Sequence, residues 1–265
     1  MDAMQSLKSN INALSSKKVA IVQSNYIPWK GYFDLINSVD EFILFDDVQY
    51  TKRDWRNRNL IKAAQPLWLT IPVQVKGKYE QKIKDVIVSD ASWANLHWKT
   101  IRQSYARAKG FREVEDFLSN LYKNANQSKL SDINFYFLEA ICRFLGIETK
   151  LKFSMDYEVI DGKSERLLHL CKQAGATVYL SGPAAKEYMD ESLFENQGVR
   201  VEYMDYSGYQ EYSQAHPPFV HHVSIIDLLC NNGNASSQLL KTEILPKRTL
   251  TEDNSVGSMK AITHF

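Results

Sequence analysis

Two short stretches near the start of the chain concentrate side chains that can bind a ligand or do chemistry. The first is Q-S-N-Y-I-P-W-K-G-Y at residues 23–32, which contains Gln23, Tyr26, Trp29 and Tyr32. Aromatic side chains there can stack on a base or a sugar, and the N–H groups at the start of a helix favour an anion. The structural alternative is a strand-to-helix turn whose aromatic side chains pack inward.

The second stretch follows closely and mixes arginines, carboxylates and aromatic side chains. Arginine forks make paired hydrogen bonds to phosphate or carboxylate, and a tryptophan offers a stacking face. Asp46 and Asp47 can orient these arginines, accept a proton or hold sugar hydroxyls, so both are candidate catalytic residues. The candidate ligand contacts are Gln49, Tyr50, Trp55, Arg56, Asn57 and Arg58. A solvated charged loop is the alternative interpretation.

Later parts of the chain add a hydroxyl and two imidazoles. Ser181 lies in Y-L-S-G-P, where a strand is expected to end and a helical turn to begin. His221 and His222 can serve as a general base near neutral pH, although adjacent histidines in a loop often contact only solvent. Ser224 and Asp227 have the spacing of a helix cap and fit a structural role.

Composition excludes several classes of partner. Lysine and arginine total 32 against 31 acidic residues, so the formal charge of +1 provides no global field for a nucleic-acid polymer or an anionic membrane. No histidine or cysteine pair has the spacing of metal ligands, so no metal site is predicted. The sequence indicates neither a cofactor nor an oligomeric state. A small-molecule substrate, met by local clusters, is the expected partner.

Cysteine usage and hydropathy predict a cytoplasmic protein without a membrane-inserted segment. Cys142, Cys171 and Cys230 are isolated and odd in number, as expected of buried thiols in a reducing compartment. No run of about 18 apolar residues occurs, and the leader has too short an apolar stretch for a signal peptide.

The order of elements predicts an α/β fold with a mainly parallel sheet and flanking helices, Rossmann-like or nucleotidylyltransferase-like. Apolar runs and helical spacing predict strand, helix and strand at 19–22, 31–38 and 41–45, and again at 150–154, 164–173 and 177–181. Parallel strands end at one sheet edge, so the loops after the first two strands should form one pocket. There we expect Gln23, Tyr26, Asp46, Gln49 and Arg56 to converge.

The remaining chain completes the expected organisation. Strands are predicted at 68–73 and 85–88, as a hairpin or an inserted β unit, and a helical segment at about 92–145. A helical turn at 184–189, a strand at 200–204 and a helix opening at 225–229 follow. We therefore expect a flexible leader at 1–18, a single domain at 19–245 and a flexible tail at 246–265.

Several blocks in order resemble the signature blocks of the WbqC-like family. They are Q-S-N-Y-I-P-W-K-G-Y-F-D, D-E-F-I-L-F-D-D-V-Q-Y-T-K-R-D-W-R-N-R-N, W-L-T-I-P-V, Y-L-S-G-P, Y-Q-E-Y-S-Q and V-S-I-I-D-L-L-C-N-N-G, spanning 19–233. The family usually has Gln-Pro where this chain has Gln23 and Ser24. The resemblance implies a role in making or modifying an activated sugar for O-antigen, capsule or related glycans, and it supplies no catalytic residue.

Taken together, these observations predict a transferase that attaches an acyl or aminoacyl group to the amine of a nucleotide-linked amino sugar. Such an amine needs positioning, a base for its proton and donors for the developing oxyanion. Nucleotidyl transfer or adenylate formation is one alternative, because the first turn is placed like the P-x-H-x-G-H turn of nucleotidylyltransferases. Here Trp29 or Lys30 and Tyr32 replace its histidines. A non-catalytic sugar-nucleotide binding protein is the other alternative.

Overall fold

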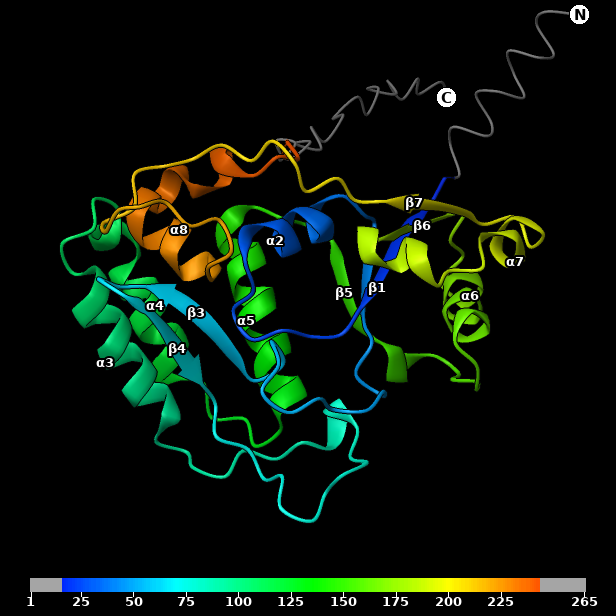
Figure 1. Ribbon diagram of the computed structural model, residues 1–265, viewed down its shortest axis with the longest axis horizontal. Helices are drawn as coiled ribbons and strands as arrows, with labels where there is room; N and C mark the ends of the chain where they lie inside the picture. The colour runs from blue at the N-terminus through cyan, green and yellow to red at the C-terminus, as the bar shows by residue number, and fades with distance from the viewer. Residues whose placement is uncertain (1–15, 244–265) are drawn as a thin grey trace, which may run out of the picture.

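The computed structural model describes residues 16–243, which are built around a five-stranded parallel sheet (Figure 1). The strand order across the sheet is β5-β2-β1-β6-β7. The strands are β1 (Lys18–Val22), β2 (Glu41–Leu44), β5 (Lys150–Phe153), β6 (Val178–Ser181) and β7 (Arg200–Tyr203). Nearly all of the predicted leader and all of the predicted tail lie outside the described residues.

The strand order contains one reversal, and that reversal lies beside β1. The chain runs from β1 outward to β2 and β5, then returns to the other side of β1 as β6 and continues outward to β7. Val19 is paired with Glu41 of β2 on one side and with Tyr179 of β6 on the other, both in parallel. In open parallel sheets a ligand crevice forms at such a switch point, outside the carboxyl ends of the strands. The predicted α/β fold is confirmed.

Both faces of the sheet are covered, because alternate side chains of each central strand enter different cores. Val19 and Ile21 of β1 pack against one cluster, with Leu168 and Phe194. Ala20 of the same strand lies in the other, larger cluster. Burial on both faces explains why these strands appear in the sequence as continuous apolar runs.

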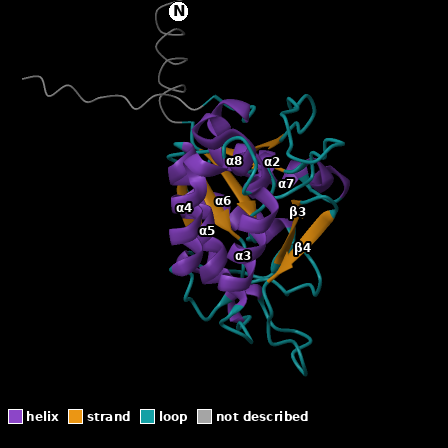
Figure 2. Ribbon diagram, turned by 90° about the vertical axis from the view of Figure 1, so that its left-hand side faces the viewer, coloured by secondary structure: helices purple, strands orange, loops and turns teal. Residues whose placement is uncertain are grey.

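The helices complete the two outer layers. Figure 2 shows α3, α4 and α5 gathered on one side, with the strands β3 and β4 on the other. The predicted helical segment at about 92–145 is three separate helices, and the last of them ends at Gly146, whose φ of 80° suits a glycine. The helices are α2 (Lys30–Asn37), α3 (Trp93–Tyr105), α4 (Phe111–Lys123), α5 (Leu130–Leu145), α6 (Ser164–Gln173), α7 (Glu191–Glu195) and α8 (Ile225–Asn232).

The predicted strands at 68–73 and 85–88 meet only at one isolated antiparallel bridge, Val73 to Val88, and do not form the predicted hairpin ladder. Strand β4 (Pro66–Thr70) pairs with β3 (Arg58–Lys62), antiparallel and with Arg58 opposite Thr70. The predicted strand at 85–88 makes only isolated bridges, after a short 3-10 turn at Ile83–Asp85. Strand β3 was missed because a polar side chain, Asn59, takes a buried position beside Ile61 and hides the apolar alternation.

Two further expectations have a definite outcome. The predicted helical turn at 184–189 is a 3-10 turn at Pro183–Glu187. Ser224 caps α8, because its side chain accepts a hydrogen bond from the Ile226 N–H. Over residues 16–243, no helix combines the length and apolar character needed to cross a membrane.

Candidate functional site

An open crevice of about 850 Å³ lies at the switch point, outside the carboxyl ends of the strands. The loop after β1 contributes Gln23 and Asn25 to its wall, and the loop after β6 contributes Ser181 and Gly182. Tyr206, from the segment after β7, also lines the crevice. The strand order of the sheet thus brings three segments that are far apart in sequence to one cavity.

Two arginines from different elements line this crevice with spare hydrogen-bond donors. Arg56 has a side chain only 12% exposed, and its Nη1 donates to the Gln23 carbonyl at 3.3 Å. Arg166 of α6 pairs with Asp47 and lies 5.1 Å from the Phe45 ring. The Nε atoms of both arginines are buried without a hydrogen-bond partner among residues 16–243. The two guanidinium groups line one cavity and are suited to an anionic group.

The first turn of α6 adds backbone donors on the same side. Gly162, Lys163 and Ser164 line the crevice at the start of this ten-residue helix. The Lys163 side chain caps none of the first N–H groups, and Glu165 Oε2 accepts a hydrogen bond from the Lys163 N–H at 3.2 Å. Unpaired N–H groups at a helix start favour negative charge. They reinforce the two arginines, and together these groups give the crevice the donor set of a phosphate or carboxylate site.

Asp46 stabilises the wall of the crevice that carries Arg56 through buried hydrogen bonds. It is fully buried and accepts hydrogen bonds from the Ser24 N–H at 2.8 Å and from the Ser131 hydroxyl. Asn134 of α5 donates to Ser24 Oγ and to the Arg56 carbonyl, both at 2.9 Å. Burial raises the pKa of Asp46, against the effect of these hydrogen bonds. Asp46 therefore ties the loop after β1 to α5.

Asp47 contacts another wall of the crevice, through Arg166 of α6. Its carboxylate is 3% exposed, accepts a hydrogen bond from Ser154 Oγ at 2.7 Å and pairs with Arg166. Both oxygens are thereby occupied by groups from other elements. The geometry makes Asp47 the group that orients Arg166 toward the crevice.

A smaller depression of about 290 Å³ adjoins the crevice. Asn25 and Trp55 line both cavities, so the two are continuous. Trp29 and His222, which both line the depression, pack against each other with ring centroids 5.2 Å apart. Burial and nearby Lys30 lower the pKa of the neighbouring His221.

Comparison with known proteins connects this site to a family. The model of the WbqC-like protein family matches residues 23–239, which include every residue that lines the two cavities except Ile21 and Val22 of β1. The chain belongs to the WbqC-like family. It is also 52% identical over 226 residues to the uncharacterized protein Rv1507c of Mycobacterium tuberculosis (strain ATCC 25618 / H37Rv), covering 85% of this chain and 98% of that protein. No solved structure matches the chain.

The family resemblance expected from the sequence is thus confirmed, and residues of the first two blocks and of Y-L-S-G-P line the crevice. The loop after β1 and the loop after β2 lie together there, as predicted from parallel topology. The crevice receives Gln23, Tyr32, Trp55, Arg56 and Ser181 from the predicted set. The adjoining depression receives Trp29 and His222.

Other predicted site residues are placed away from both cavities. Tyr26 is fully buried, and its hydroxyl lies 2.9 Å from His97 Nδ1 and from the Tyr122 hydroxyl. Gln49 is exposed and donates to the Tyr79 carbonyl at 2.9 Å. The strand-to-helix turn thus sends one aromatic side chain inward and leaves another at the site.

The remaining candidate residues line neither cavity and instead stabilise the segments that do. Asn57 is buried and donates to the Ile71 carbonyl at 2.8 Å. Arg58 stacks on Trp68, with its guanidinium 4.2 Å from the ring centre. Tyr50 is buried, and burial raises its pKa to about 12. These side chains brace the hairpin and the loop that carry Trp55 and Arg56.

Arg166, Tyr206 and Asn25 are among the lining residues that were not predicted from the sequence. Arg166 lies in an ordinary amphipathic helix, and Tyr206 in a loop with no periodicity. Asn25 stands inside the first stretch but was passed over in favour of its aromatic neighbours. Only the family block containing Asn25 offered a signal; nothing local distinguishes the other two.

The cysteines lie apart from this chemistry. Cys142, Cys171 and Cys230 are free and buried. Burial raises the pKa of Cys171 to about 12 and also raises the pKa of Cys142 and Cys230. Thiols in such surroundings stay protonated near neutral pH. Within residues 16–243, no cluster of three or more histidine, cysteine or acidic side chains is arranged to hold a metal ion.

Proposed function

We propose that this WbqC-like protein is a transferase of surface-polysaccharide (O-antigen) biosynthesis that binds a nucleotide-linked amino sugar and transfers an acyl or aminoacyl group to its amine. The observation that carries the proposal is the crevice at the switch point, where Arg56, Arg166 and the start of α6 present free donors. Those groups are suited to the two phosphates of a nucleotide-linked sugar.

The size and shape of the cavities support a ligand with more than one part. A crevice of about 850 Å³ is within the range of sites for drug-sized ligands. The adjoining depression is lined by aromatic side chains and no arginine or lysine. A ligand with phosphates at one end and an uncharged ring at the other matches this division.

The chemistry requires few groups from the protein. The unprotonated amine attacks the carbonyl carbon of an activated acyl donor, the C–N bond forms, and the bond to the leaving group breaks. In this proposal His222 takes the amine proton and the Ser181 hydroxyl donates to the developing oxyanion. Asp46 and Asp47 act as positioning residues, because their oxygens already accept hydrogen bonds from the protein.

The three buried free thiols support a cytoplasmic location as part of the same proposal, since free cysteines are typical of reducing compartments. The named role in O-antigen synthesis rests on the family, which matches over residues 23–239.

The test has a binding stage and a turnover stage. Calorimetric titration should detect binding of UDP- or dTDP-linked amino sugars, and mass spectrometry should detect acylated product after addition of acyl thioesters or aminoacyl esters. Binding without turnover would leave a sugar-nucleotide binding protein. Release of pyrophosphate from ATP or CTP would instead support nucleotidyl transfer. Absence of any nucleotide binding would reject the proposal.

A further inference from the structure

The depression beside the crevice is built by a turn with a strained backbone. Ile27, a fully buried β-branched residue, has a φ of 38°, a region that such side chains rarely adopt. Its neighbours Asn25 and Pro28 both line the depression. Strain of this kind costs on the order of 1–3 kcal/mol and persists only where surrounding contacts impose it.

Hydrogen bonds from separate segments impose the strained turn. Ser224 Oγ donates to the Ile27 carbonyl at 2.7 Å, and the Ile225 N–H donates to the Pro28 carbonyl at 2.8 Å. Asn59 Nδ2 donates to the Tyr26 carbonyl at 3.1 Å. The hairpin and the start of α8 therefore hold the turn in a shape that its own sequence disfavours. The result of that shape is the placement of Asn25 and Trp29 around one hollow.

Gly31 provides the space that the Trp29 indole occupies. A Cβ atom added to Gly31 would lie 2.3 Å from Trp29 Cζ2, far inside contact distance. The indole therefore lies directly on the first turn of α2. Tyr206 and Tyr209 meet the same indole edge-on at 5.2 and 5.5 Å, so its orientation is held from the other side as well.

Asn25 stands where the crevice and the depression meet, with an acceptor that has no partner. Its Oδ1 is buried and accepts no hydrogen bond from any part of the chain that the structure describes. A buried acceptor without a donor costs free energy that a ligand N–H can recover. Because no arginine or lysine lines the depression, a phosphate is not the group that suits it.

We infer that the depression binds the amino-sugar ring, with Trp29 and Trp55 against the ring and Asn25 Oδ1 accepting an N–H of the reactive amine. This inference rests on the proposed function, because the phosphates of the same ligand occupy the adjoining crevice. It assigns selection of the amine to Asn25, at the junction of the two cavities. Accepting that hydrogen bond also aims the nitrogen toward the side of the depression that carries His222.

The test compares paired ligands by calorimetric titration of the full chain. Each UDP- or dTDP-linked amino sugar is paired with the analogue that carries hydrogen in place of the amine, and plain UDP and dTDP report on the crevice alone. The wild-type protein should prefer the amino sugar by about tenfold or more. Asn25→Leu should abolish that preference and leave the affinity for UDP or dTDP unchanged.

Gly31→Ala is an independent variant in which no residue that lines the cavities is replaced. The added methyl group displaces the Trp29 indole, so affinity for the sugar part should fall several-fold and tryptophan fluorescence should shift, with UDP or dTDP affinity retained. An undiminished amino-sugar preference in Asn25→Leu would overturn the inference and leave the proposed function standing. Should Asn25→Leu fail to fold, undiminished affinity of Gly31→Ala for the sugar part would do the same. A wild-type protein that binds neither UDP nor dTDP would overturn both.

Discussion

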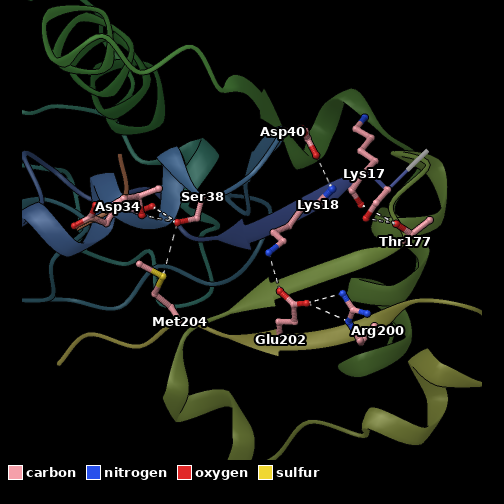
Figure 3. A network of polar contacts seen from close by, with 11 residues as sticks. Lys17, Lys18, Asp34, Ser38, Asp40, Thr177, Arg200, Glu202 and Met204 are labelled. Atoms are coloured by element: carbon pink, nitrogen blue, oxygen red, sulfur yellow. Dashed lines mark hydrogen bonds and ion pairs between the residues drawn. The ribbon is translucent and has the colours of Figure 1, made fainter. Parts of the chain in front are cut away.

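The two ends of the strands in the central sheet differ in how their charged side chains are paired. At the edge where the strands begin, Lys18 Nζ and Arg200 Nη2 each lie 2.7 Å from an oxygen of Glu202, as Figure 3 shows. At the edge where the strands end, Arg56 and Arg166 each keep a buried Nε without a partner among residues 16–243. Charges at the first end satisfy one another. At the second end Arg56 and Arg166 also pair with Asp54 and Asp47, and each keeps in addition an Nε without a partner among residues 16–243.

The ends of one strand, β2, show the same contrast in their carboxylates. Glu41 begins the strand, and hydrogen bonds from Tyr157 and Lys17 lower its pKa although burial alone would raise it. Asp46 follows the end of the strand, and there burial prevails and raises the pKa. A cation lies within ion-pair distance of Glu41, at 2.9 Å, whereas Asp46 is held by two serines. Burial of the Asp46 charge therefore costs free energy at the end of the strand near the site, and its hydrogen bonds hold the loops there.

Removing the Asp46 carboxylate should have the largest effect on stability. Asp46→Ala leaves the Ser24 N–H and the Ser131 hydroxyl buried without an acceptor, so we expect a loss of about 3 kcal/mol in the free energy of unfolding. Asp46→Asn keeps an acceptor and removes the buried charge, so its loss should be smaller. Urea denaturation measures both. Equal losses in the two variants would contradict the structural role of these hydrogen bonds.

Exchanging arginine for lysine at each edge tests the contrast most directly. Arg56→Lys should weaken binding of a nucleotide-linked sugar about tenfold, or about 1.4 kcal/mol, because lysine cannot reproduce the guanidinium fork. Arg200→Lys, the matched control at the other edge, should leave binding unchanged. Calorimetric titration and melting curves are run together. A lowered melting temperature with unaltered affinity in Arg56→Lys would make this arginine a structural brace.

The two carboxylates of β2 should respond to pH with opposite signs. A lowered folded-state pKa means that Glu41 stabilises the fold above its unfolded pKa, and that this contribution is lost as the pH falls through the folded pKa. Glu41→Gln should therefore cost about 1 kcal/mol at about pH 7 and almost nothing at about pH 3.

The raised pKa of Asp46 means that the wild-type carboxylate loses stability as the pH rises through its folded value. Asp46→Asn should therefore compare better with the wild type at about pH 7 than at about pH 3. Urea denaturation at stepped pH measures both variants, and stability differences that follow pH in the same direction would break the comparison.

The smallest expected effect belongs to the ion pairs at the starting edge. Lys18 and Glu202 are about one-third exposed, so solvent screens their attraction. Glu202→Gln should lower stability by about 0.5 kcal/mol and leave ligand binding unaltered. Thermal melting at low and high salt measures it. A loss that persists unchanged at high salt would show that packing, and not charge, accounts for the effect.

Much of the candidate site could be predicted because it follows two strands. The apolar runs at β1 and β2 and the short connection between them indicate parallel strands, whose following loops share an edge. Gln23, Arg56 and Ser181 were found in this way. The β3–β4 hairpin was not predicted, because Asn59 of β3 is buried and donates to the Tyr26 carbonyl, a contact between distant residues that local periodicity does not reveal.

The sequence by itself determined the family, the parallel sheet and the edge at which a ligand should bind, because these follow from ordered blocks and from local apolar patterns. Only the tertiary structure decided which side chains of each loop face the cavities. Tyr26 turns into the core and Asn25 lines both cavities, in a turn whose Ile27 has a positive φ and a carbonyl held by a hydrogen bond from Ser224. Arg166 joins the site only through folding, since α6 meets the loop after β2 across more than a hundred residues of chain. Contacts between residues so far apart in sequence depend on how whole helices and strands pack, so a local sequence pattern does not predict them.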